Sequence, residues 1–303
     1  MSKLFEMLYK NRGEIAEVVL PLVEGQTCES VEGNGGFKSE DTLTATARPT
    51  AAQGSRPAEA PRTPQVRTLS LHVPAPSPLL PFEKDQWRPS EQYRTLRTKI
   101  GQHPTRPHLI VISSPASGDG KSVTAINTAG ALALQSGGQV LLLDADLRRS
   151  LIHSQVGLPE SPGLSEVLSG ACTTQEALVR TQEFPNLYVM TAGERPANPV
   201  ELLDSERWRA LCAEFPEMFR YVIIDSPPVG AVADFELIQA VCDGVILVLR
   251  PDVTDRHLCR NALGFVQKTK FLGVLLNCVP DWSPARHAGS EYYYYSGEKA
   301  YQR

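Results

Sequence analysis

A lysine in a glycine-rich stretch carries the first chemistry that the chain suggests. Lys121 and Ser122 follow Gly118 and Gly120, between an apolar run and a segment with a helical pattern. Glycines let backbone N–H groups approach phosphate oxygens, and the start of a helix adds the positive end of its dipole. A lysine at this spacing reaches the β and γ phosphates, and the hydroxyl beside it binds Mg²⁺. The stretch therefore predicts a site for a nucleoside triphosphate.

The loop departs from the usual phosphate-loop formula at Pro115, which stands where the formula has its first glycine. An ordinary glycine-rich turn between a strand and a helix would look similar, so other residues must decide between the two interpretations. If the loop binds phosphate, its contacts fall on consecutive residues around the lysine. The predicted nucleotide-binding residues of the loop are Ser117, Gly118, Asp119, Gly120, Lys121, Ser122 and Val123.

Acidic residues end two of the apolar runs and favour the nucleotide site. Asp144 and Asp146 follow Leu141–Leu143, and Asp225 follows Val222–Ile224. A single aspartate there would more often cap a helix or form a turn. Several carboxylates at buried strand ends need compensation, which a divalent cation supplies, and with the lysine they indicate Mg-ATP. The predicted catalytic residues are Lys121, Asp144, Asp146 and Asp225, and the predicted Mg²⁺ ligands are Ser122, Asp144 and Asp225.

Tyrosines near the end of the sequence offer hydroxyl groups that can accept a phosphoryl group. Contiguous rings cannot all face one core, which favours acceptors over a packed aromatic patch. A tyrosine hydroxyl has a pKa of about 10, so a nearby carboxylate, Asp144 or Asp146, would accept its proton. The sequence leaves the choice between these two open. The predicted acceptors are Tyr292, Tyr293, Tyr294, Tyr295 and Tyr301.

Short runs rich in Val, Ile and Leu alternate with segments of helical periodicity in the second part of the chain. Runs that are apolar on both faces suit strands covered by helices on both sides. This pattern predicts an α/β fold with a doubly wound, mostly parallel sheet, in which ligands bind beyond the carboxyl ends of the strands. The runs cover residues 108–113, 140–143, 187–191, 221–224, 244–249 and 273–276.

The chain divides into four predicted parts. Residues 1–23 have apolar side chains at helical spacing and predict a short amphipathic helix, which either folds back on the main domain or docks on a partner or membrane. Residues 24–89 are rich in Pro, Gly, Ser and Thr and predict a disordered linker. Residues 90–284 form the predicted nucleotide-binding domain, and residues 285–303 a flexible tail that carries the tyrosines.

Composition excludes several other classes of protein. The 303 residues carry a net charge of −4, which gives no sign of a nucleic-acid-binding surface. No stretch is long and apolar enough to span a bilayer, and the start lacks the apolar core of a signal peptide. The 6 cysteines form no CxxC pair, which favours reduced thiols over a metal site. We therefore expect a cytoplasmic protein, recruited at most to the inner face of the cell membrane.

At these positions the sequence resembles the bacterial tyrosine kinases of capsule and exopolysaccharide synthesis, the BY-kinases. Residues 144–149, Asp-Ala-Asp-Leu-Arg-Arg, resemble the family's Walker A′ element, and residues 223–228 resemble its Walker B motif. Residues 163–170 and 196–203 also look like family segments. The resemblance covers the chain from about residue 90. It implies a P-loop NTPase fold of the deviant Walker type, with ATP and Mg²⁺ as cofactors.

The same resemblance implies how the chain assembles. Glu91, Arg94 and Arg97 match the family's ExxRxxR helix, which implies ring-like self-association, although they could instead form a local ion pair on a solvated helix. Asn277 stands where relatives place an amide that contacts adenine, although it could be a turn residue. Also implied are autophosphorylation in trans, regulation of polysaccharide synthesis and export, and a membrane-spanning adaptor on a separate chain.

Two rival functions remain open at the level of sequence. The chain could be a partition- or division-type ATPase switch without kinase activity. Such proteins carry a lysine near the start of the phosphate loop, and residues 113–117 contain none, which argues against this rival. The chain could also be a catalytically idle regulatory subunit of a polysaccharide assembly complex, although the intact lysine and acids make this the weaker alternative.

Overall fold

The computed structural model describes residues 19–22, 66–73, 87–135, 137–251 and 253–279, and for 19–22 and 87–89 it describes the backbone alone. Within these residues one sheet has the strand order β1-β9-β8-β3-β7-β4-β6-β5-β2. Among the strand pairs that the described residues form, only β5–β6 is antiparallel. The strands are β1 (Val19–Leu22), β2 (Arg67–Leu69), β3 (Leu109–Ser113), β4 (Val140–Asp144), β5 (Val179–Thr181), β6 (Leu187–Met190), β7 (Tyr221–Asp225), β8 (Gly244–Leu249) and β9 (Phe271–Asn277).

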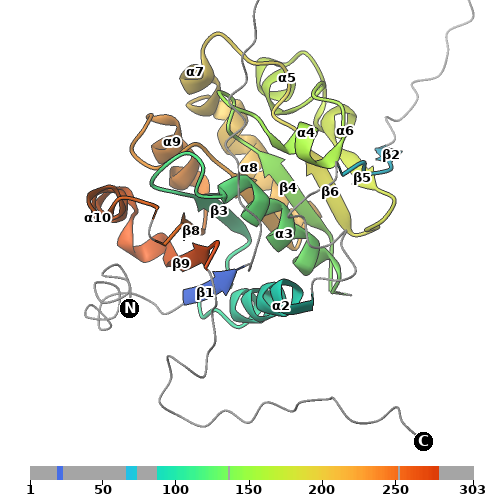
Figure 1. Cartoon of the computed structure of the whole chain (residues 1–303). Coiled ribbons are helices and arrows are strands. Elements are labelled where there is room, and N and C mark those ends of the chain that lie inside the picture. Colours follow the sequence, from blue (N-terminus) through green and yellow to red (C-terminus); the bar gives the residue numbers. More distant parts are fainter. Residues whose placement is uncertain (1–18, 23–65, 74–86, 136, 252, 280–303) are drawn as a thin grey trace, which may run out of the picture.

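Helices cover both faces of this sheet (Figure 1). They are α2 (Trp87–Gly101), α3 (Lys121–Ala133), α4 (Ile152–Val156), α5 (Leu164–Ser169), α6 (Thr174–Ala177), α7 (Pro199–Leu203), α8 (Glu206–Met218), α9 (Asp234–Val241) and α10 (Arg256–Phe265), with a short 3₁₀ turn at Lys268–Lys270. None of the helices in the described part of the chain is long and apolar enough to cross a bilayer.

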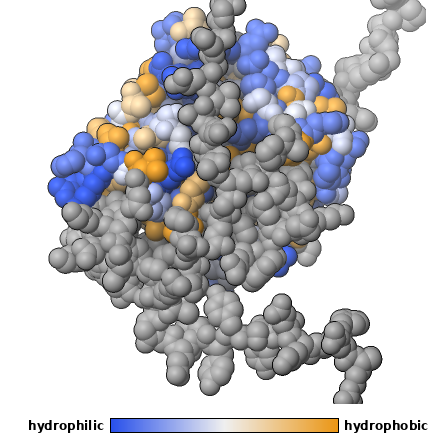
Figure 2. Space-filling view, viewed as in Figure 1, coloured by the Kyte–Doolittle hydropathy of each residue, from blue (hydrophilic) through white to orange (hydrophobic). Residues whose placement is uncertain are grey.

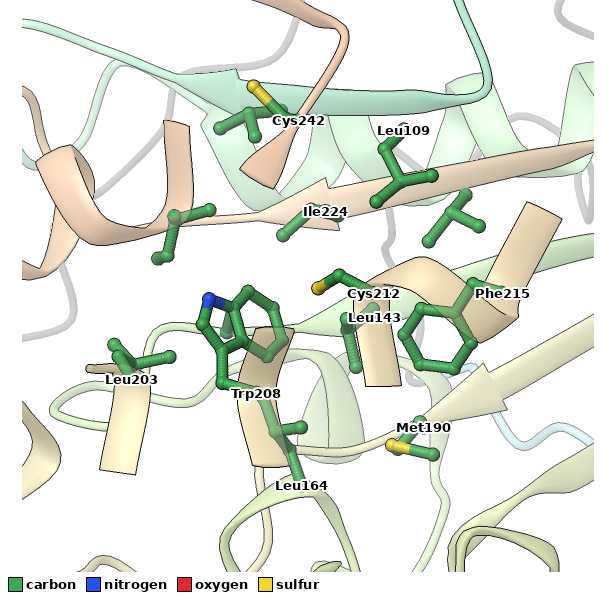
Figure 3. Close-up of a cluster of buried hydrophobic side chains, with 14 of the residues drawn as sticks. Leu109, Leu143, Leu164, Met190, Leu203, Trp208, Cys212, Phe215, Ile224 and Cys242 are labelled. Carbon is green, nitrogen blue, oxygen red and sulfur yellow. The ribbon is translucent and has the colours of Figure 1, made fainter. Parts of the chain in front are cut away.

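Alternation along each strand divides the core into two layers. Ile110 and Ile112 of β3 pack with α2 and α3 on one face, whereas Leu109 and Val111 pack on the other face. The second layer contains the fully buried Trp208 and the side chains around it (Figure 3). Because both faces are covered, the central strands need apolar residues at every position, which is the pattern that the sequence shows. The predicted doubly wound, mostly parallel fold is confirmed.

On the surface formed by the described residues, large apolar side chains are few. The exposed large apolar side chains are spread over several segments, and only α10 contributes two of them, Leu258 and Phe265. In the view of Figure 2, small hydrophobic areas lie among hydrophilic ones. Scattered apolar residues of this kind are normal for a folded protein. They are Leu134, Leu151, Val200, Met218, Val253, Leu258 and Phe265.

The prediction of an amphipathic helix over residues 1–23 is wrong for the last turn of that helix. Val19–Leu22 form strand β1, which pairs in parallel with β9 from Val274 to Asn277. The open edge of β9 offers backbone hydrogen bonds that outweigh a weak helical pattern, and Pro21 is tolerated because β1 is itself an edge strand. The rest of the predicted helix lies outside the described residues.

The predicted linker over residues 24–89 is wrong at two places. Arg67–Leu69 form β2, which pairs with β5, and α2 begins at Trp87 rather than at residue 90. The segment 66–73 is held by backbone hydrogen bonds, among them His72 N–H to Val156 O at 2.9 Å. A proline-free stretch between Pro64 and Pro74 allows this pairing, and a proline in the first turn of a helix is tolerated.

Candidate active site

The site lies at the carboxyl edge of the central strands, where the register brings the predicted acids together. Asp144, the last residue of β4, pairs directly with Asp225, the last residue of β7. Ile112 of β3 pairs with Asp225 on the other side, so the loop that follows β3 begins beside the same carboxylate. Parallel strands end at one edge of a sheet, which is why three segments far apart in the sequence meet here.

Two glycines give the loop between β3 and α3 its shape. Gly118 has φ of 91° and Gly120 has φ of 93°, a left-handed conformation that side chains disfavour. A Cβ atom at Gly120 would also collide with the side-chain nitrogen of Asn277. Helix α3 starts at Lys121, so its free N–H groups and positive dipole end face the loop. This is the arrangement expected of an anion site.

Lys121 is the cation at the centre of the site. Its side chain is buried, and its Nζ donates a hydrogen bond to Asp146 Oδ2 at 3.0 Å and lies 3.6 Å from Asp225 Oδ1. It also lies 3.3 Å from the Ser122 hydroxyl. Burial alone would lower the pKa of Lys121, but Asp225 and Asp146 outweigh it and raise the pKa above its usual value. Lys121 is therefore charged and reaches both acidic strand ends.

The two carboxylates at the strand ends have different partners. Asp144 accepts a hydrogen bond from Asp146 N–H (3.1 Å) on one oxygen and from Ile152 N–H (3.2 Å) on the other. Neither oxygen of the fully buried Asp225 has hydrogen-bond geometry with any described residue, although the Ser122 hydroxyl is close enough to lower its pKa. Burial raises the pKa of both carboxyls, and their mutual repulsion adds to the rise at Asp144.

Three buried aspartates face one lysine, so the site has an excess of negative charge that favours a cation. The Asp225 carboxylate and the Ser122 hydroxyl next to it are oxygen ligands that suit Mg²⁺. In the described part of the chain no three His, Cys, Asp or Glu side chains are grouped to hold a metal by themselves. Mg²⁺ commonly completes its coordination with substrate phosphates. The residues therefore fit Mg²⁺ that arrives with a nucleotide.

Asn277 lies against the loop between β3 and α3. It ends β9, is 8% exposed, and donates a hydrogen bond from Nδ2 to the backbone oxygen of Asp119 at 3.0 Å. The structure thus brings the predicted loop residues, the three aspartates and Asn277 to one place.

The predicted assembly residues lie elsewhere. Arg97 donates to the backbone oxygen of Ala131, ten residues beyond Lys121 and about 15 Å along the axis of α3. Glu91 and Arg94 form an exposed ion pair at 2.8 Å. The predicted acceptor tyrosines, residues 292–295 and 301, lie outside the described residues.

Two residues at the site were not predicted from the sequence. Asp234 is fully buried at the start of α9 and holds Arg148 through two hydrogen bonds of 2.8 and 3.0 Å. Thr254, in the turn after β8, donates its hydroxyl to Asp119 at 2.7 Å. Both follow strands of the same sheet, so the rule that ligands bind beyond the carboxyl ends could have indicated their segments. The pair with Asp234 also shows that the Arg148 guanidinium is engaged within the protein.

Comparison with known proteins decides the family. No family model matches the chain. The chain is similar to the tyrosine-protein kinase YwqD of Bacillus subtilis (strain 168), with 38% identity over 192 residues, 62% of this chain and 80% of that protein. The chain belongs to the bacterial tyrosine-protein kinases. It is also similar to the tyrosine-protein kinase CpsD of Streptococcus agalactiae, with 33% identity over 62% of this chain and 83% of that one.

Solved structures of the family have the same fold. The chimerical protein CapA2B2 is 31% identical, with a TM-score of 0.64 over 72% of this chain and 95% of its own. The kinase domain of the Escherichia coli tyrosine kinase ETK is 27% identical, with a TM-score of 0.57 over 68% of this chain and 79% of its own. The family predicted from the sequence is therefore confirmed.

Proposed function

We propose that this chain transfers the γ-phosphoryl group of Mg-ATP to tyrosine hydroxyls, including those of its own C-terminal segment. The observation that carries the proposal is Lys121, buried at the start of α3 between Asp146 and Asp225. Phosphoryl transfer needs alignment of the reacting groups and neutralisation of charge more than covalent help from the protein. This site supplies a fixed cation, a loop of backbone N–H groups and acidic groups within one small region.

Binding of the triphosphate would use the loop and the first turn of α3. Backbone N–H groups from Ser117 to Val123 would surround the phosphates, with the glycines allowing close approach. Ser122 and Asp225 would hold Mg²⁺, which neutralises phosphate charge when bound, and Asp144 would act on the waters of the ion. Asn277 would contact the nucleobase from the end of β9. The oxygens of Asp225, which accept no hydrogen bond from the described residues, support its assignment as the acid that faces the ion.

Lys121 would change partners when the nucleotide binds. The γ-phosphate competes with Asp146 for the ammonium group, because a phosphate carries more negative charge than a carboxylate. Released from Lys121, Asp146 keeps its hydrogen bond from Arg149 N–H (3.0 Å) and has one oxygen free. Asp144 lacks this freedom, since both of its oxygens accept backbone N–H groups. We therefore assign Asp146 as the group that accepts the tyrosine proton.

Phosphoryl transfer then occurs as a single displacement at the γ-phosphorus. The tyrosine oxygen forms a bond to the γ-phosphorus while the bond from that phosphorus to the β–γ bridging oxygen breaks. ADP leaves with the bond's electron pair, and the tyrosine proton moves to an oxygen of Asp146. Lys121 stabilises the charge that develops on the leaving side and on the γ-phosphoryl oxygens.

Acceptor tyrosines at residues 292–295 and 301 would enter the site of a neighbouring copy. A mixing experiment tests this: a full-length chain with Lys121→Met serves as the acceptor, and a full-length chain whose five tail tyrosines are phenylalanine serves as the enzyme. Phosphotyrosine on the Lys121→Met chain, found by mass spectrometry, is the expected result. Its absence, while wild type alone becomes labelled, would show that transfer occurs within one chain.

ATP hydrolysis without any phosphotyrosine would instead support the partition- or division-type ATPase switch. Lack of both hydrolysis and transfer would support an idle regulatory subunit. Both measurements use the same purified protein with Mg-ATP, so one experiment separates the three functions.

We further propose that the kinase assembles as a ring through α2 and acts with a membrane-spanning adaptor on a separate chain in polysaccharide synthesis and export. Glu91 and Arg94 are exposed, so they are accessible to a neighbouring subunit. Phosphorylated tails would repel one another and loosen the ring. Substituting both residues with alanine should reduce the mass of the assembly in light scattering while the isolated chain stays folded. An unchanged mass would reject α2 as the interface.

A further inference from the structure

A buried carboxylate lies inside the phosphate-binding loop, where a negative charge opposes the binding of a triphosphate. Asp119 is 2% exposed, and burial raises the pKa of its carboxyl. Its Oδ2 accepts a hydrogen bond from Ala116 N–H at 3.1 Å, and its Oδ1 accepts one from the Thr254 hydroxyl at 2.7 Å. Both oxygens are thus engaged by the protein, one within the loop and one outside it. The carboxylate serves the shape of the loop.

The loop needs such support because its own backbone is permissive. Pro115 has no N–H group and replaces the first glycine of the usual formula. Asp119 stands between Gly118 and Gly120, which both have a positive φ and restrict the chain little. The backbone oxygen of Asp119 accepts a hydrogen bond from Asn277 Nδ2 at 3.0 Å. Asp119 is therefore the residue through which the loop is attached to β9 and to the turn after β8.

Thr254 is placed to fix the direction of its hydroxyl proton. Its Oγ1 accepts a hydrogen bond from Arg250 N–H at 2.8 Å, and its own N–H donates to Arg250 O at 2.8 Å. A hydroxyl has one proton, and the one on Thr254 is given to Asp119. Thr254 is 9% exposed, so water competes little for this bond. A hydrogen bond to a charged carboxylate in such a place is among the stronger kinds.

We propose that Thr254 is a positioning residue for nucleotide binding, which acts through Asp119. The hydroxyl holds the Asp119 carboxylate away from the phosphates and keeps the loop N–H groups turned toward them. It also joins the loop to the turn after β8, so the two move as one unit with Asn277. This inference rests on the proposed function of the loop as the ATP phosphate site.

The proposal predicts an effect on binding rather than on the chemical step. Loop N–H groups contact the phosphates in the ground state and in the transition state alike, so misplacing them weakens both equally. Thr254→Val keeps the shape of the side chain and removes the hydroxyl. We expect it to raise the Kd for Mg-ADP and the KM for ATP roughly tenfold, with kcat changed less than about threefold. Thr254→Ser keeps the hydroxyl and should stay within about threefold of wild type in both constants.

The matched control is Thr181→Val, which removes another buried hydroxyl. Thr181 lies in β5, is 1% exposed, and donates its hydroxyl to Phe184 O at 2.8 Å, away from the nucleotide site. This variant should lose thermal stability while its Kd for Mg-ADP stays at the wild-type value. The comparison separates positioning of the loop from a general loss of stability.

The binding constants are measured on the full-length chain by titration with a fluorescent ADP analogue and Mg²⁺, and circular dichroism checks folding. A Kd for Thr254→Val within about twofold of wild type would overturn the proposal, and so would an equal weakening by Thr181→Val. If Thr254→Val does not fold, Thr254→Ala takes its place with the same expected weakening. Because binding is measured apart from phosphotyrosine formation, failure of the kinase proposal and failure of this one are distinguishable.

Discussion

The carboxyl ends of β4 and β7 lie side by side and end in the same residue type, yet they are built differently. At the end of β4, Asp144 accepts two backbone N–H groups and so holds the segment that follows it. At the end of β7, Asp225 accepts no hydrogen bond from the described residues. A buried carboxylate that accepts no hydrogen bond is costly even beside a lysine, and such groups persist where function requires them. From this comparison we expect Asp144 mainly to position the segment after β4 and Asp225 to make the direct contact with the proposed Mg²⁺ ion.

Lys121 contacts acidic residues at both strand ends, so removing its side chain should have the largest effect on activity. Lys121→Met removes the cation that faces Asp146 and Asp225 and that we propose to neutralise the γ-phosphate. We expect phosphotyrosine formation to fall at least about a hundredfold, which corresponds to about 2.7 kcal/mol of transition-state stabilisation. The rate is measured with purified protein and Mg-ATP. Retention of more than a tenth of the wild-type rate would contradict the assignment of the site.

Replacing the two carboxylates by amides should separate their roles. Asp225→Asn loses no hydrogen bond within the described structure, and although it removes the contact with Lys121, that lysine keeps its ion pair with Asp146. It also removes the repulsion between Asp225 and Asp144, so the nucleotide-free protein should be at least as stable as wild type, while Mg²⁺ no longer strengthens nucleotide binding. Asp144→Asn leaves one of two buried N–H groups without an acceptor. It should therefore be about 1–3 kcal/mol less stable than Asp225→Asn. Chemical denaturation measures the stabilities. Equal stability of the two variants would contradict the different structural roles given to Asp144 and Asp225.

The pH dependence of stability offers a second test of this pair. Burial raises the pKa of both carboxyls above the usual value of 3.8. Between 3.8 and the raised pKa values the folded protein keeps protons that the unfolded chain has released, so this contribution to stability is lost as the pH rises. Because the groups interact, they titrate as a pair. Wild type should thus lose stability relative to Asp225→Asn as the pH rises from 4 to 7. A difference in stability between the two proteins that stays constant over this range would contradict the raised pKa values.

The smallest expected effect concerns the link between the two strand ends. Arg148 follows β4, Asp234 starts the helix after β7, and two hydrogen bonds join them. Arg148→Lys keeps the charge but loses the paired geometry, which should cost about 0.5–1.5 kcal/mol of stability. Arg209→Lys, in an exposed ion pair with Asp204, serves as the control and should change stability by less than about 0.5 kcal/mol. If thermal denaturation shows equal losses of stability for Arg148→Lys and Arg209→Lys, the burial of Asp234 does not strengthen its pair with Arg148.

Much of this site could be predicted from the sequence because it depends on order and spacing. The apolar runs before Asp144 and Asp225 predict central strands, and parallel strands bring their ends together. Lys121 and Ser122 were likewise expected between a glycine-rich loop and a helix, and α3 begins at Lys121 itself. Side-chain partners could not be predicted, because the sequence does not show which carboxylate accepts the backbone N–H groups of its own loop.

The parts that the sequence did not predict depend on contacts between distant segments. The strands β1 and β2 form because sheet edges at β9 and β5 offer backbone partners, and local composition carries little of that information. The bond between Asp119 and Thr254 joins residues 135 positions apart. Only the rule that segments after parallel strands share one edge would have placed Thr254 near the phosphate loop.

The most direct test of the account is the identity of the residue that becomes labelled when the purified full-length chain is incubated with Mg²⁺ and ATP carrying a labelled γ-phosphate. The account predicts phosphotyrosine on residues 292–295 or 301, dependent on Mg²⁺ and abolished by Lys121→Met. Label on serine or threonine, or label on tyrosine that persists in Lys121→Met, would contradict it.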